Sequence, residues 1–76
     1  MDFLFTATLS ANEVDAAYQV YFNQEKYMFL PDTNDKNLSS FSLKREHDEW
    51  HDEDLPSPQL RKQAINALEE YLLAQH

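Results

Sequence analysis

Residues 17–31, AYQVYFNQEKYMFLP, decide the fold of this 76-residue chain. Large apolar side chains recur at every second position on both sides of the central NQEK, and a period of two is typical of β-strands. A loop of only two residues pairs Phe22 with Tyr27, and the same register pairs Val20 with Phe29. A slip of one residue would turn one apolar set to the wrong face. The stretch therefore predicts a tight hairpin, although it lacks the Asn-Gly or Asp-Gly pair that such turns favour.

Other segments of the chain have the same period of two. In FLFTATL, residues 3–9, we expect Phe3, Phe5, Ala7 and Leu9 to share one face. SANEVDA, residues 10–16, follows this segment and breaks the alternation, so we expect a turn or short loop there. FSLKRE and EWHDE complete the set of candidate strands. The predicted strands cover residues 2–9, 17–23, 26–30, 41–46 and 49–53.

The period changes at Ser57. A hydroxyl residue followed by proline is typical of a helix start, because the hydroxyl caps a free N–H and Pro58 loses no hydrogen bond at the first helical position. Apolar residues then recur at helical spacing from Leu60 onward, on one face. These features predict a helix over residues 58–75. The polar segment 31–40 is expected to be the most mobile loop.

Together these elements predict an α+β fold. Sequential strands with short links form an antiparallel β-meander of four to five strands, and one C-terminal helix packs on one of its faces. We expect residues 1–76 to form a single small domain. The aromatic residues expected to face the helix are Tyr18, Phe22, Tyr27 and Phe29.

The composition excludes several classes of function. The chain has no cysteine, which excludes disulfides, zinc-thiolate sites and a thiol nucleophile, and no glycine, which excludes the glycine-rich phosphate loops. Nucleic-acid binders need a basic footprint, so a net charge of −8 predicts no direct nucleic-acid binding. The N-terminal stretch has neither a positively charged start nor an apolar run of membrane length, so we expect a cytoplasmic protein. Without glycine, the turns are expected to use residues that tolerate positive φ. Candidates are Asn12, Asn23, Asn34, Asn37 and Asp48.

EHDEWHDEDLP, residues 46–56, gathers six carboxylates, two imidazoles and the only tryptophan. His47 and His51 have the spacing of a metal pair on a helix, but on a strand four residues span about 13 Å, too far for two zinc–nitrogen bonds. The segment lacks the glycine and the ligand spacing of a calcium loop. Its acids share similar aqueous surroundings, whereas catalytic carboxylates need different ones. We interpret it as a solvated turn, with no metal ligand, cofactor or catalytic residue.

A hairpin explains the acidic stretch better than a metal site. With His47 and Asp48 at the tip, Arg45 lies opposite Trp50, and an arginine over an indole gives a cation–π contact. This register puts Trp50 on the face that carries Phe41. We therefore expect the indole to be turned inward while its acidic neighbours stay hydrated.

The charges of the predicted helix oppose its dipole. Arg61 and Lys62 lie near the positive N-terminal end, which is unfavourable by a few tenths of a kcal/mol each. Asp52, Glu53 and Asp54 lie just before this end of the helix. We expect them to compensate by facing both cations.

Two classes of function remain after these exclusions. The first is a small non-catalytic protein-interaction or accessory domain, with self-association as one form of it. Its candidate surface is Tyr21, Met28, Leu30 and Trp50, because an exposed apolar patch marks an interface; scattered surface apolar residues, which are normal, are the competing explanation. The alternative is an acidic decoy or inhibitor that occupies the nucleic-acid-binding surface of a basic protein. An enzyme is a third class, which we do not expect, because so small a fold has little room for a pocket of about 300 Å³ or more.

Overall fold

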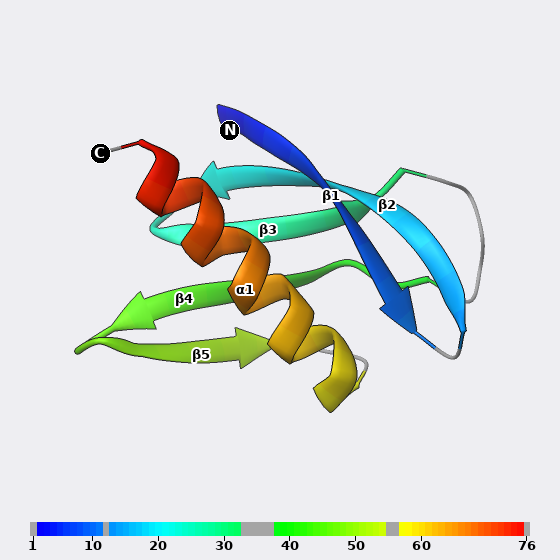
Figure 1. Ribbon diagram of the computed structural model, residues 1–76. Helices are drawn as coiled ribbons and strands as arrows, with labels where there is room; N and C mark the ends of the chain where they lie inside the picture. Colours follow the sequence, from blue (N-terminus) through cyan, green and yellow to red (C-terminus); the bar gives the residue numbers. More distant parts are fainter. Residues whose placement is uncertain (1, 12, 33–37, 55–56, 76) are drawn as a thin grey trace.

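Five strands and one helix follow one another along the chain in the predicted order (Figure 1). The computed structural model describes residues 2–11, 13–32, 38–54 and 57–75. Each strand pairs antiparallel with the next, and this confirms the predicted α+β meander with a C-terminal helix. The elements are β1 (Asp2–Ala11), β2 (Val14–Asn23), β3 (Lys26–Pro31), β4 (Phe41–Glu46), β5 (Glu49–Glu53) and α1 (Pro58–Ala74).

The hairpin of β2 and β3 has the predicted register. Phe22 lies opposite Tyr27, and Val20 lies opposite Phe29. Gln24 and Glu25 form the two-residue loop, with φ angles of 52° and 66°. Two positive φ angles in succession are those of a type I′ turn, whose twist matches that of the flanking strands.

The first hairpin is longer than predicted. SANEVDA, residues 10–16, was expected to be a loop, but β1 continues to Ala11 and β2 begins at Val14. The pairing of Leu9 with Ala16 explains the difference, because both side chains are buried and Ala16 is too small to mark an alternating pattern in the sequence. The expectation of a loop over these residues was therefore wrong.

A β-bulge in β1 corrects the predicted face of Phe3. Phe3 pairs with Tyr21, and Phe5 pairs with Val20, so the register shifts at Leu4. A bulge places two residues of one strand against one of its partner. Phe3 therefore lies on the opposite face from Phe5, Ala7 and Leu9, and not with them as predicted.

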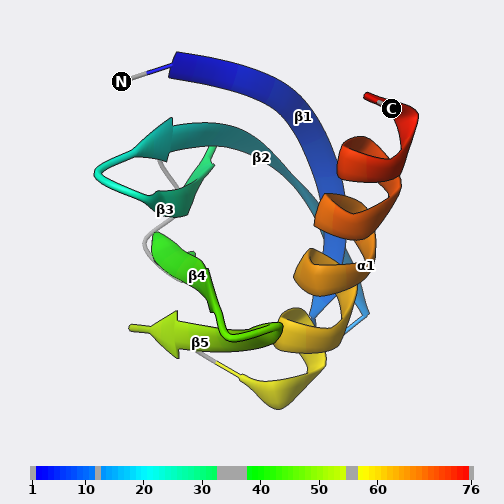
Figure 2. The ribbon, with the colours of Figure 1, turned by 90° about the vertical axis from the view of Figure 1, so that its left-hand side faces the viewer.

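The core lies between one face of the sheet and α1. Figure 2 shows the sheet curving so that its concave face is turned toward the helix. Tyr18 and Phe29 are buried there as predicted, Tyr27 is half-buried, and Phe22 remains 37% exposed at the margin. Full burial of one large apolar side chain stabilises a fold by about 1.5–3 kcal/mol. The buried residues form one cluster: Ala7, Leu9, Ala16, Tyr18, Val20, Phe29, Phe41, Leu43, Leu60, Ala64 and Leu68.

The start of α1 has the predicted cap. The Ser57 hydroxyl accepts a hydrogen bond from the Leu60 N–H at 3.4 Å, and Pro58 occupies the first turn. Among the described residues, no helix is long and apolar enough to span a membrane.

The turns use fewer of the expected residues than predicted. Of the five candidates, Asp48 has a positive φ, whereas Asn23 does not. Asn12, Asn34 and Asn37 lie outside the described residues, as does the middle of the predicted 31–40 loop.

The two edges of the sheet differ in length and charge. β1 forms one edge with ten residues, of which only Asp2 is charged. β5 forms the other edge with five residues, and three of them are acidic. Short, charged edges discourage pairing with a further strand, and β1, unlike β5, is neither short nor highly charged.

Candidate interaction surface

Four apolar side chains lie together on the outer face of the sheet, opposite α1. Phe3, Tyr21 and Met28 are direct neighbours across β1, β2 and β3, and Leu30 is two residues along from Met28. We call these four residues the outer patch. Phe3 is 54% exposed, and its ring meets the edge of Tyr21 with the centroids 5.5 Å apart. No described helix or strand covers this face.

Polar neighbours hold Tyr21 in place within the outer patch. Its hydroxyl donates a hydrogen bond of 2.7 Å to the Gln19 Oε1. The Gln19 amide in turn donates one of 3.0 Å to the Asp32 carboxylate. A half-buried tyrosine with a bound hydroxyl presents a rigid ring, which costs little entropy to use in a contact.

Trp50, the fourth predicted surface residue, lies on the other face of the sheet. It pairs with Arg45, whose guanidinium carbon is 5.6 Å from the indole centroid, as the register predicted. Its ring packs edge-on against Tyr27 at 5.8 Å, beside the core. The structure thus brings Tyr21, Met28 and Leu30 together and separates Trp50 from them. It adds Phe3, which faces outward because of the bulge at Leu4 and which regular alternation would have placed on the other face.

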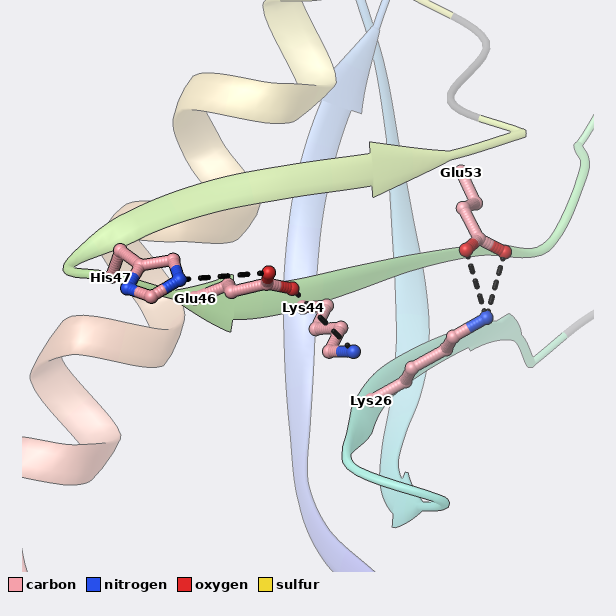
Figure 3. A network of polar contacts seen from close by, with 5 residues as sticks. All are labelled: Lys26, Lys44, Glu46, His47 and Glu53. Atoms are coloured by element: carbon pink, nitrogen blue, oxygen red, sulfur yellow. Dashed lines mark hydrogen bonds and ion pairs between the residues drawn. The ribbon is translucent and has the colours of Figure 1, made fainter.

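Ion pairs border the outer patch over β3, β4 and β5. Lys26 Nζ contacts both Glu53 carboxylate oxygens, at 2.8 and 2.9 Å, and Lys44 lies 3.6 Å from Glu46 (Figure 3). Glu53 therefore pairs with β3 and not with the helix, which corrects one part of the predicted compensation. These pairs give the outer patch a polar rim with little net charge.

Asp52 does pair with the helix as predicted. Arg61 Nε lies 3.0 Å from Asp52 Oδ2, and its Nη2 donates to the Trp50 carbonyl at 2.9 Å. Arg61 thus ties the first turn of α1 to β5 by two hydrogen bonds. Lys62, next to it, is exposed.

The histidines of the acidic stretch lie on an exposed hairpin. His47 is at the tip, with 89% of its side chain exposed, and its Nε2 is 3.9 Å from Glu46. His51 lies opposite Lys44 in β5 and is also exposed. Within the ranges that the structure describes, no three His, Cys, Asp or Glu side chains are grouped so as to hold a metal ion.

A groove of about 600 Å³ lies between the edge of β1 and α1. The two elements are neighbours in the fold (Figure 2). The expectation that so small a fold has little room for a pocket of about 300 Å³ or more was wrong for this groove. The sequence did not predict it, because no local period reveals where a helix lies relative to one edge of a sheet. Its lining residues are Phe5, Thr6, Ala7, Thr8, Leu9, Gln63, Asn66, Ala67, Glu70 and Tyr71.

A second, smaller hollow of about 220 Å³ lies near the end of α1, between Leu4, Phe22 and Leu72. Small-molecule sites usually measure about 300–1,000 Å³, so this hollow is below that range.

Comparison with models of known protein families, with curated proteins and with solved structures gave no match in any of the three. The function proposed for this chain therefore depends on features of its own surface.

Proposed function

We propose that the protein is a small non-catalytic protein-interaction or accessory domain, and that it binds a protein partner through the outer patch. The observation that carries this proposal is the contact of the exposed Phe3 ring with the half-buried Tyr21 ring on a sheet face that no described element covers. A contiguous apolar patch with a polar rim is typical of a protein interface. The partner should present an apolar surface to it.

The surroundings of the polar residues support a role without catalysis. In the described part of the chain, Tyr18 is buried, and no other side chain with an ionisable group is. Catalytic acids and bases depend on environments that separate their pKa values, and a shared aqueous surface does not provide them. In this proposal the domain acts in the cytoplasm, uses no cofactor, and binds neither nucleic acid nor membrane.

The ion pairs favour this proposal over the acidic decoy. A decoy needs free carboxylates to imitate phosphates. Asp52, Glu53 and Glu46 are each bound to a cation of the same chain. Asp48 is almost fully exposed but lies 3.8 Å from Arg45. These contacts reduce the negative field that a basic protein would meet.

Replacement of the outer patch tests the proposal. Phe3→Ser combined with Met28→Ser removes the most exposed ring and its neighbour two strands away, and Leu73→Ser is the matched control, because Leu73 is 75% exposed outside the patch. The three proteins are first compared by circular dichroism and light scattering. A partner captured from native lysate by the unaltered chain is then purified, and its affinity is measured by calorimetry.

We expect the double variant to weaken binding by about tenfold or more, as loss of a buried aromatic contact does, while Leu73→Ser leaves the affinity unchanged. Equal affinity for all three proteins would contradict the proposal. A concentration-dependent dimer that the double variant abolishes would instead identify the partner as a second copy.

A further inference from the structure

The outer edge of β1 carries backbone groups that point away from β2. The Ser10 N–H donates to Gln63 Oε1 at 2.7 Å, and the Ser10 carbonyl accepts from Gln63 Nε2 at 2.5 Å. The Gln63 amide thus binds Ser10 as a residue of a neighbouring strand would. Because the backbone direction alternates along an antiparallel strand, Thr8 and Thr6 point their N–H and C=O groups the same way.

The groove of about 600 Å³ runs along this edge, and contacts between β1 and α1 lie toward its two ends. At one end Phe5 stacks on Tyr71, with the ring centroids 4.7 Å apart and the planes 13° from parallel. At the other end lies the contact of Gln63 with Ser10. The length between Phe5 and Ser10 corresponds to about 17 Å of strand, enough for about five extended residues.

The lining of the groove combines apolar side chains with uncharged polar ones and one carboxylate. Ala7 and Leu9 are buried, and Ala67 is half-buried beside them. The small alanine side chains leave room for a guest side chain between strand and helix. Glu70 is the only charged lining residue, and the last turn of α1 contains no basic residue. A long cationic side chain therefore matches the groove, with its methylene stem on the alanines and its charge at Glu70.

We propose that the edge of β1 binds an extended basic segment of another protein. The segment adds a sixth strand, with its backbone paired to Thr6 and Thr8 and one Lys or Arg side chain in the groove beside Glu70. Main-chain hydrogen bonds supply the affinity in this mode of binding, and the side-chain pocket supplies the specificity. This site lies on a different surface from the outer patch and does not depend on it.

A second copy of the chain does not match the groove as well. The β1 sequence, DFLFTATLSA, contains no Lys or Arg, so pairing of two β1 strands leaves both Glu70 carboxylates without a cation. Each copy also brings a net charge of −8, and the repulsion opposes association.

A pair of capped peptides tests the site. The probe is VTKTV, in which the lysine and both valines share one face of the strand, and VTETV is its matched control. Backbone amide shifts are followed by NMR as each peptide is added to the full chain. We expect VTKTV to shift Thr6, Thr8 and the groove residues of α1, and to bind about tenfold or more tightly than VTETV.

Four variants separate the contributions. Glu70→Gln should remove the preference for lysine, whereas Glu69→Gln, one residue away but outside the groove, should keep it. Thr8→Pro removes one outward N–H and should therefore weaken the binding of both peptides. The fold should persist, because an edge proline leaves the ladder to β2 intact. The Phe3→Ser and Met28→Ser variant should bind VTKTV normally, which distinguishes this site from the outer patch.

Several outcomes would overturn the inference. These are the absence of saturable shifts up to about 10 mM peptide, equal affinity for the two peptides, or shifts confined to the outer face of the sheet. Shifts of Thr6 and Thr8 on simple concentration of the free protein, with a dimer in light scattering, would assign the edge to a second copy.

Discussion

Individual residues in the turns adopt backbone angles that their side chains disfavour. Positive φ angles occur at Glu13, Gln24, Glu25, His47, Asp48 and Asp54, in a chain that has no glycine. A left-handed conformation costs an L-residue about 1–2 kcal/mol. The hairpins therefore form because the pairing of their strands outweighs the local cost of the turns.

Glu25→Gly should stabilise the protein. Glycine removes the cost of φ 66° at this position, and part of the gain is lost to the greater entropy of the unfolded chain. We expect a net gain of about 0.5–1 kcal/mol, which raises the melting temperature by roughly 2–8 °C. Calorimetry measures the change.

The matched control for this substitution is Glu69→Gly in α1. Glycine inside a helix costs about 0.5–1 kcal/mol, so this variant should melt at a lower temperature than the unaltered chain. A Glu25→Gly variant that melts at the same temperature as the control would contradict the account of the turn.

At the scale of elements, the first turns of α1 are held by contacts with both edge strands of the sheet. Arg61 reaches Asp52 and the Trp50 carbonyl in β5, and Gln63 reaches Ser10 in β1. These contacts orient the helix over the core. They also explain why Arg61 is tolerated near the positive end of the helix dipole.

Arg61→Glu should destabilise the fold more than Lys62→Glu does. Arg61→Glu breaks two hydrogen bonds of a charged group and places a carboxylate beside Asp52, which should cost about 1–2 kcal/mol after allowance for solvent exposure. Lys62 is exposed, and its replacement should change the free energy of unfolding by no more than about 0.5 kcal/mol.

Urea unfolding in low and high salt measures both effects. The loss caused by Arg61→Glu should be smaller in high salt, because its Coulomb part is screened while its hydrogen-bond part is not. Equal losses for the two variants, or a loss independent of salt, would show that the contact with Asp52 does not stabilise the helix.

At the scale of the whole molecule, the buried residues form one core cluster around Tyr18, which is only 1% exposed. Burial raises the pKa of the Tyr18 hydroxyl above its ordinary value of 10.0, because the ionised form loses hydration. The folded state therefore keeps this proton at a pH where the unfolded state has released it. Stability linked to Tyr18 is complete below pH 10.0 and falls as the pH rises toward the folded pKa.

Tyr18→Phe should make the protein less sensitive to alkali. The ring, which packs edge-on against Phe41 at 5.7 Å, is kept, and the ionisable hydroxyl is removed. Urea unfolding between about pH 8 and pH 11 should show a shallower decline for the variant than for the unaltered chain. Parallel declines would mean that ionisation of Tyr18 does not contribute to alkaline unfolding.

The sequence predicted the elements of this molecule better than their relation in space. The β2–β3 hairpin, the β4–β5 register with its Arg45–Trp50 pair and the Ser57 cap depend on residues close together in the chain, and all were predicted. Phe3 faces away from the core because a bulge interrupts the period of two in β1. The groove depends on how α1 lies beside β1, and residues more than fifty positions apart, such as Ser10 and Gln63, determine it.

The unequal edges of the sheet limit how far association can proceed. Growth into a fibril requires that every molecule offer two compatible sides, one to the unit before it and one to the unit after it. β5 is only five residues long and rich in charged side chains, and such edges discourage pairing with a further strand. In the proposed mode of binding, addition at β1 therefore ends after a single step, and the chain recruits a strand without seeding a polymer.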